Sequence, residues 1–142
     1  MSEARYLIDT NVLSELARPA PEPHLVDWLS TLVRPATSAL VCYELARGIE
    51  RLAADKRKRF LESWLAELLR ALETIPLDER SALAAARIER AAHQAGRSVE
   101  VRDLLIVATT QVEGCQLATR NVDDMRGLGV MVYDPFSDTR TM

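Results

Sequence analysis

Five acidic side chains lie next to apolar segments that are far apart in this sequence. They are Asp9, Glu44, Asp103, Asp123 and Asp124. Carboxylate oxygens are the ligands that Mg²⁺ prefers, and Mn²⁺ accepts the same donors. Such ions orient and deprotonate water and stabilise a leaving oxygen during in-line displacement at phosphorus. These residue types therefore indicate a divalent-cation site for phosphate chemistry, provided that the fold brings the acids together.

Each acid also has an interpretation without chemistry. Asp9 could start a turn or cap a helix. Glu44 falls at the border of a helix's apolar stripe, where its stem can pack while its head reaches water. Asp103 opens a helical pattern and would complement the helix dipole, although a capping carboxylate keeps a second oxygen free for a metal. Asp123 and Asp124 could simply form a polar loop.

Short apolar runs alternate with helical patterns along the chain. We predict strands at residues 5–8, 36–39, 74–77, 116–119 and 130–133. We predict helices from Asn11 to before Pro19, from about Pro23, from residue 40 to about 54, and over 56–73, 81–95 and 103–112. This alternation favours a parallel sheet covered by helices on both faces, a three-layer α/β sandwich. Ligands bind beyond the carboxyl ends of such strands, where Asp9 stands.

Composition excludes several classes of protein. The 142 residues, 48% of them hydrophobic and 27% charged, predict one globular domain over residues 1–142. No apolar run reaches the roughly 18 residues needed to cross a bilayer, so we expect no membrane association and a cytoplasmic protein. His24 and His93 lack the spacing of zinc ligands. Cys42 and Cys115 are predicted to be buried core residues rather than a disulfide.

Four segments carry a resemblance to a known family. They are residues 7–16 (LIDTNVLSEL), 43–48 (YELARG), 96–97 (GR) leading into 103–110 (DLLIVATT), and 117–124 (LATRNVDD), ending near 132–136 (VYDPF). In this order they resemble the PIN-domain ribonucleases, specifically the VapC-type toxins of toxin–antitoxin pairs. The resemblance implies a PIN-like α/β/α sandwich with a central, mostly parallel sheet of four or five strands.

The resemblance also implies an activity and a set of site residues. The implied activity is that of a Mg²⁺-dependent endoribonuclease, with Mn²⁺ as an alternative ion. Asp9, Glu44 and Asp103 match the family's metal-binding acids, and Thr10 matches a hydroxyl that supports the first acid. Two residues compete for the fourth position. They are Asn121, which stands where many relatives carry Asp, and Asp124, which matches an acid common slightly later.

Partners follow from the same resemblance. It implies an RNA substrate and a homodimer held by a cognate antitoxin of a type II pair, whose C-terminal tail covers the acidic groove. The net charge of −3 suits a basic antitoxin segment. The basic run 56–59 is consistent with contacts to RNA or to a partner, or with a solvated helix start. Arg47 and Arg51 share the helix of Glu44 and are placed to contact phosphate.

Two other functions compete with the nuclease. A phosphatase with an aspartyl nucleophile also places Asp after its first strand, but it needs an acid two residues later, where this chain has Asn11. A catalytically weak PIN-like binding module, acting through its partner, is favoured by Asn121 and opposed by the three intact acids. Metal-dependent cutting of RNA separates these possibilities.

Overall fold

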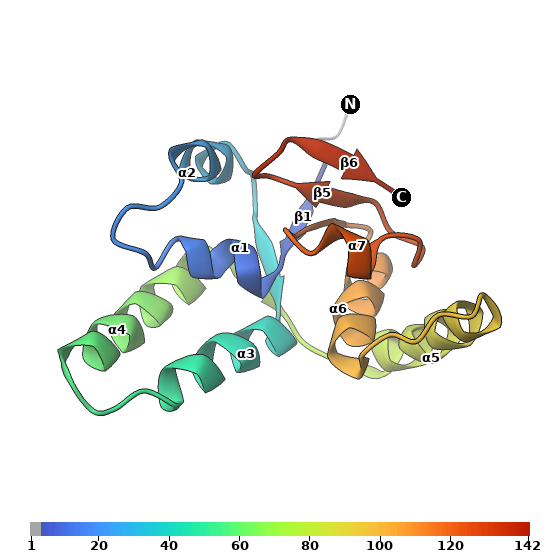
Figure 1. The fold of residues 1–142 in the computed structure, drawn as a ribbon, viewed down its shortest axis with the longest axis horizontal. Helices are drawn as coiled ribbons and strands as arrows, with labels where there is room; N and C mark the ends of the chain where they lie inside the picture. Colours follow the sequence, from blue (N-terminus) through green and yellow to red (C-terminus); the bar gives the residue numbers. More distant parts are fainter. Residues whose placement is uncertain (1–3) are drawn as a thin grey trace.

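The computed structural model describes residues 4–142, which form one six-stranded sheet surrounded by helices (Figure 1). The strands are β1 (Tyr6–Ile8), β2 (Ala36–Ser38), β3 (Glu73–Ile75), β4 (Gln116–Ala118), β5 (Val132–Asp134) and β6 (Thr139–Thr141). The helices are α1 (Thr10–Glu15), α2 (Pro23–Ser30), α3 (Ala39–Glu50), α4 (Lys56–Ala71), α5 (Glu79–Gln94), α6 (Val101–Val112) and α7 (Val122–Met125).

The sheet has the strand order β3-β2-β1-β4-β5-β6. Every neighbouring pair is parallel except β5 and β6, so the predicted mostly parallel sheet is confirmed. The predicted number of four or five strands was too small, because β6 adds an antiparallel edge strand. Its residues Thr139, Arg140 and Thr141 are polar and largely exposed, and they therefore lack the apolar run by which strands are found in a sequence.

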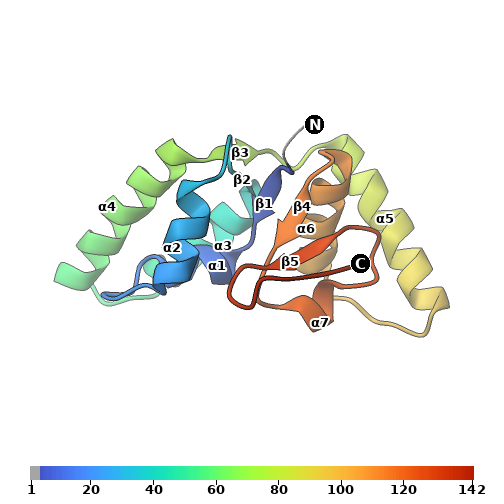
Figure 2. The ribbon, with the colours of Figure 1, turned by 90° about the horizontal axis from the view of Figure 1, so that it is seen from above.

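Helices cover the sheet on both sides. Figure 2 shows α1 to α4 on one side of β1, and α5 and α6 on the other side. The centre of the core is β1, whose Leu7 lies opposite Ala36 of β2 and Leu117 of β4. All three side chains are fully buried, as expected for central strands of a parallel sheet with both faces covered. The predicted α/β/α arrangement is therefore observed.

Several predicted boundaries were wrong by a few residues. The first helix begins at Thr10, not Asn11, because Asp9 is extended and caps it with its side chain. The predicted Asp103 cap lies at the third position of α6, which begins at Val101. The short helix α7 was not predicted, and β3 begins at Glu73, which had been assigned to the preceding helix.

Helices α3 and α4 form a pair that projects from the sheet (Figure 1). Leu61 of α4 is buried, and Trp64, Leu65 and Leu68 pack against the core. Phe60 lies on the same helix, but 55% of it is exposed. The outer end of α4 therefore has little cover.

Both cysteines are free, as predicted. Cys115 is buried just before β4, whereas Cys42 is only half-buried, because it lies at the margin of the α3 stripe rather than at its centre. Within residues 4–142, no helix is long and apolar enough to cross a membrane.

Candidate active site

Asp9 is held rigidly at the carboxyl end of β1. Its backbone N–H donates to the Ala118 carbonyl at 2.9 Å, and only 5% of the residue is exposed. The carboxylate accepts hydrogen bonds on both oxygens, from the Thr10 backbone N–H at 2.8 Å and from the Thr119 hydroxyl at 2.8 Å. Burial raises the pKa of Asp9, and these two hydrogen bonds partly oppose the rise. The helix-cap interpretation of Asp9 is therefore confirmed, and both of its carboxylate oxygens accept hydrogen bonds from the protein.

Thr119, at the end of β4, organises the turn around Asp9 and was not predicted as a site residue. Besides donating to Asp9, its buried hydroxyl accepts from the Asn11 side-chain amide at 3.1 Å and from the Asn121 backbone N–H at 3.0 Å. The Asn11 carbonyl oxygen in turn accepts from the Arg120 backbone at 3.0 Å. A hydroxyl residue at the last position of a predicted strand was the available signal, since neighbouring parallel strands end at one edge.

Glu44 reaches the site from the first half of α3. Its Oε1 accepts a hydrogen bond from the Thr10 hydroxyl at 3.1 Å. Thr10 thus contacts both acids, through its backbone N–H to Asp9 and through its side chain to Glu44. Partial burial raises the pKa of Glu44, the Thr10 hydrogen bond lowers it, and the Asp9 charge raises it. The Thr10 hydroxyl was expected to support the first acid, Asp9, but in the structure it donates to Glu44, and only the Thr10 backbone N–H contacts Asp9.

Asp103 faces the same region from α6. Partial burial is the largest cause that raises its pKa to about 6, and the charges of Glu100, Asp9, Asp124 and Glu44 add to the rise. These charges act over a short range in a partly buried environment. Asp9, Glu44, Asp103 and Asp124 therefore belong to one region of negative potential, although β1, α3, α6 and α7 supply them separately.

The two residues that competed for the fourth position have different environments. Asp124 is exposed on α7, and its charge reaches Asp103. Asn121 precedes α7, and its described contact is the backbone hydrogen bond to Thr119 rather than one from its side-chain amide. Of these two residues, Asp124 is the one whose charge acts on Asp103, although the charge of Glu100 acts on it more strongly.

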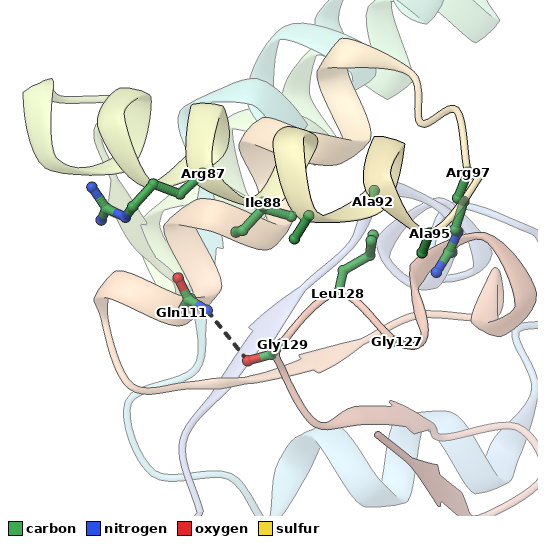
Figure 3. A pocket seen from close by; sticks show the side chains of 10 residues that line it. Arg87, Ile88, Ala92, Ala95, Arg97, Gln111, Gly127, Leu128 and Gly129 are labelled. Atoms are coloured by element: carbon green, nitrogen blue, oxygen red, sulfur yellow. Dashed lines mark hydrogen bonds between the residues drawn. The ribbon is translucent and has the colours of Figure 1, made fainter.

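Arg97 positions the segment that carries Asp124. Its guanidinium donates to the carbonyl oxygens of Asp124 at 2.6 Å and Asp123 at 3.3 Å, and it also contacts the Arg126 carbonyl. Gly127 has a positive φ of 78°, and an added Cβ would lie 3.2 Å from the guanidinium. Arg97 and Gly127 also line an open pocket of about 390 Å³ between α5 and the segment that follows α7 (Figure 3). No role was predicted for Arg97 from the sequence.

The acids share one region without forming a finished metal cage. Across residues 4–142, no three His, Cys, Asp or Glu side chains are grouped closely enough to hold a metal ion as they stand. Thr10 lies between Asp9 and Glu44, and Asp103 approaches from another helix. The arrangement offers hard oxygen donors beside buried, well-oriented Asp9.

Comparison with known proteins gives the family. The PIN domain family model matches residues 6–128, which contain all the candidate acids. The chain belongs to the PIN-domain family. Toxin FitB of Neisseria gonorrhoeae is 32% identical over 137 residues, covering 93% of this chain and 99% of that protein. VapC ribonuclease Y4jK of Sinorhizobium fredii is 27% identical over 135 residues, covering 92% of this chain and 96% of that one.

Solved structures show the same fold. The crystal structure of FitAcB from Neisseria gonorrhoeae matches with a TM-score of 0.86 at 32% identity, covering 92% of this chain and 98% of that chain. FitAB bound to an IR36 DNA fragment also matches with a TM-score of 0.86, at 30% identity over 92% and 95% of the two chains. The chain is therefore a homologue of PIN-domain toxins whose solved structures are toxin–antitoxin complexes.

Proposed function

We propose that this protein is a Mg²⁺-dependent endoribonuclease and the toxin of a type II toxin–antitoxin pair. The observation that carries the proposal is the convergence of Asp9, Glu44, Asp103 and Asp124 on one partly buried region at the carboxyl end of the sheet. Burial is the main cause that raises the pKa values of Glu44 and Asp103, and repulsion from neighbouring acids adds to it; a bound cation would stabilise the ionised forms. The name of the VapC ribonuclease relative supports the same activity.

The donor set fits Mg²⁺, and Mn²⁺ as an alternative, because all of the proposed ligands are carboxylates. Asp9, Glu44 and Asp103 are the proposed ligands. Glu44 and Asp103 are partly exposed, so their side chains can rotate toward the buried Asp9 carboxylate. When bound, the ion would lower the pKa of a water molecule and neutralise charge on the phosphate.

The protein's own residues then have distinct roles in hydrolysis. Thr119 and Thr10 fix the Asp9 carboxylate, and Thr10 also orients Glu44. Water attacks phosphorus and loses a proton to solvent, a new P–O bond forms as the bond to the leaving ribose oxygen breaks, and the leaving oxygen takes up a proton from solvent. Asp124 adds negative charge on the side of α7. Asn121 contributes to the site through the backbone of its turn.

The proposed partners follow from the relatives. Because the FitAcB and FitAB structures are complexes, we propose that a cognate antitoxin binds this chain and covers the acidic region. We also propose a homodimer, which the family resemblance implies, and a cytoplasmic location, which the composition led us to expect. The substrate is RNA, whose phosphodiester backbone matches the chemistry of the acids.

Asp9→Asn tests the nuclease assignment. Purified protein is incubated with structured RNA and Mg²⁺, with EDTA in a parallel reaction. We expect metal-dependent cleavage that Asp9→Asn lowers at least about a hundredfold, because the amide keeps the size of the side chain but loses its charge. Circular dichroism checks that the variant is folded.

Asp27→Asn is the matched control, since Asp27 is an exposed aspartate on α2. It should cleave RNA at the parent rate. Equal cleavage by Asp9→Asn and the parent would exclude the proposed site. A folded parent that binds RNA and antitoxin but never cleaves, with Mg²⁺ or with Mn²⁺, would instead identify the binding module that Asn121 had suggested.

A further inference from the structure

The tip of the α3–α4 pair is the most basic part of the chain. Residues 47–59 contain six cationic side chains and two acidic ones, in a protein with a net charge of −3. The six are Arg47, Arg51, Lys56, Arg57, Lys58 and Arg59, and we call them the basic tip. Five of them are exposed, and Lys58 is half-buried.

Acidic side chains of the protein do not neutralise the basic tip. Within residues 4–142, none of its six members forms a salt bridge. The nearby Asp55 carboxylate is already used as the N-cap of α4, accepting from the Lys58 backbone N–H at 3.0 Å. Lys58 Nζ donates to the Glu50 carbonyl at 3.4 Å, and Arg57 lies 5.7 Å from the centre of the Phe60 ring.

The placement of the tip on α4 opposes the stability of that helix. Its last four members occupy the first four positions of α4, and the first turn contains no acidic residue. The positive end of the helix dipole lies there and disfavours cations, which also repel one another. A sequence that breaks a local rule without compensation inside the fold points to a role outside it.

The basic tip is continuous with the candidate active site. A groove of about 210 Å³ between α1, α3 and α4 is lined by Thr10 and Glu44 at the site and by Arg57 at the tip. Along α3, Arg47 and Arg51 lie roughly 4.5 Å and 10.5 Å of helix axis beyond Glu44. A strand that reaches the acids can therefore extend along these cations.

We propose that the basic tip binds the RNA backbone next to the phosphate that is cleaved. The inference rests on the proposed function, because RNA is the polyanion that the acidic site would act on. The acids alone would repel a polyanion, and the cations about one and two helical turns away on α3, with Arg57 across the groove, offset that repulsion. Phosphate contacts of this kind supply affinity and register without reading sequence.

The test compares two matched pairs of substitutions, both made in the Asp9→Asn protein so that RNA stays intact. Arg57→Gln/Arg59→Gln removes two exposed arginines from α4. The control Arg87→Gln/Arg90→Gln removes two exposed arginines from α5, which also has 16 residues. Fluorescence anisotropy measures binding of a labelled single-stranded RNA between low and physiological salt.

We expect the α4 pair to weaken RNA binding roughly tenfold at low salt and to reduce the slope of log K against log salt by about 1.4, while the α5 pair changes neither. We also expect Tm to rise in the α4 pair, since cations leave the positive end of the helix dipole. A structural role for these arginines would lower Tm instead.

Two outcomes would overturn the inference: unchanged RNA affinity in the α4 pair, or an equal loss in both pairs. Unchanged RNA affinity with lost binding of the cognate antitoxin would assign the tip to the protein partner. The inference and the nuclease proposal fail separately. Binding through the tip without Mg²⁺-dependent cleavage by the parent overturns the nuclease, whereas cleavage with tip-independent binding overturns the tip.

Discussion

Acidic side chains are paired with arginines at the amino end of the parallel strands and lack such partners at the carboxyl end. At the amino end, Glu73 of β3 contacts Arg5 and accepts a hydrogen bond from Arg34 at 3.0 Å. Glu113, just before β4, pairs with Arg80 at 3.1 Å. The hydrogen bonds from Arg34 and Arg5 lower the pKa of Glu73. Negative charge at this end is therefore balanced.

At the carboxyl end the charges are left unbalanced. Within residues 4–142, Asp9, Glu44 and Asp103 take part in no salt bridge. Their pKa values are all raised, with burial as the main cause. Arg102 opposes the effect at Glu44, but its guanidinium is hydrogen-bonded to Glu100 at 3.0 Å. Partly buried carboxylates with raised pKa values and no cationic partner therefore distinguish the end of the sheet at which we propose that a ligand binds.

Removing the Thr119 hydroxyl should have the largest effect at the carboxyl end, after the substitution of Asp9 itself. Thr119→Val keeps the shape but leaves Asp9, Asn11 and the Asn121 backbone without their shared partner. We expect a loss of about 1–3 kcal/mol in the free energy of unfolding. We expect cleavage to fall roughly a hundredfold, because Asp9 is no longer held in place. Urea unfolding and RNA cleavage measure the two effects.

Thr119→Ser is the matched control, since it keeps the hydroxyl and removes a methyl group. It should recover most of the cleavage rate. If Thr119→Val cleaves RNA at the parent rate, the orientation of Asp9 does not depend on this hydroxyl. The proposed difference in side-chain positioning between the two ends of the sheet would then be wrong.

Asp103→Asn tests whether the unpaired acidic charges at the carboxyl end destabilise the fold. Because the pKa of Asp103 is raised from 3.8 to about 6, its contribution to stability is present below pH 4 and lost as the pH rises through 6. The Asn variant without metal should therefore be more stable than the parent at pH 7.5, on the order of 1 kcal/mol after solvent screening.

Urea unfolding in EDTA at several pH values measures this difference, which should shrink toward pH 4. Asp27→Asn again serves as the control and should show no such trend. A variant that is less stable than the parent at pH 7.5 would mean that Asp103 stabilises the fold and is not strained.

Glu73→Gln at the amino end should have the smallest effect. The substitution leaves Arg5 and Arg34 without a carboxylate partner, so we expect a small fall in Tm that high salt reduces. RNA cleavage should stay at the parent rate, because Glu73 lies at the opposite end of the strands from Asp9. A strong loss of cleavage with an unchanged Tm would show that Glu73 also acts in catalysis, and would contradict the proposal that the active site lies only at the carboxyl end.

Much of the candidate site was predictable because its residues stand at recognisable local positions. Asp9 follows an apolar strand, and Glu44 lies at the border of the apolar stripe of a predicted helix. Thr119 and Arg97 were missed as positioning residues, since each acts through partners far away in the sequence. Thr119 reaches Asp9 across 110 residues, and Arg97 reaches the Asp124 carbonyl across 27. Local patterns carry no record of such contacts.

Some elements of the fold were likewise predictable from local sequence patterns, and others were not. Apolar periodicity predicted the alternation of strands and helices, because burial of one face requires it wherever the segment packs. It missed β6, which pairs at the sheet edge through backbone hydrogen bonds and buries little. It also missed α7, a helix of four residues whose carbonyls Arg97 satisfies.

By itself, the sequence determined the family, the parallel sheet and the identities of the acids, since these follow from local residue types and their order. Tertiary structure alone decided that Asp9, just after β1, and the acids of α3, α6 and α7 lie within electrostatic range of one another, while the acids beside β3 and β4 pair with arginines. The physical reason is that pKa shifts and salt bridges depend on distances of a few ångströms in space. Strand order sets those distances, and separation along the chain does not.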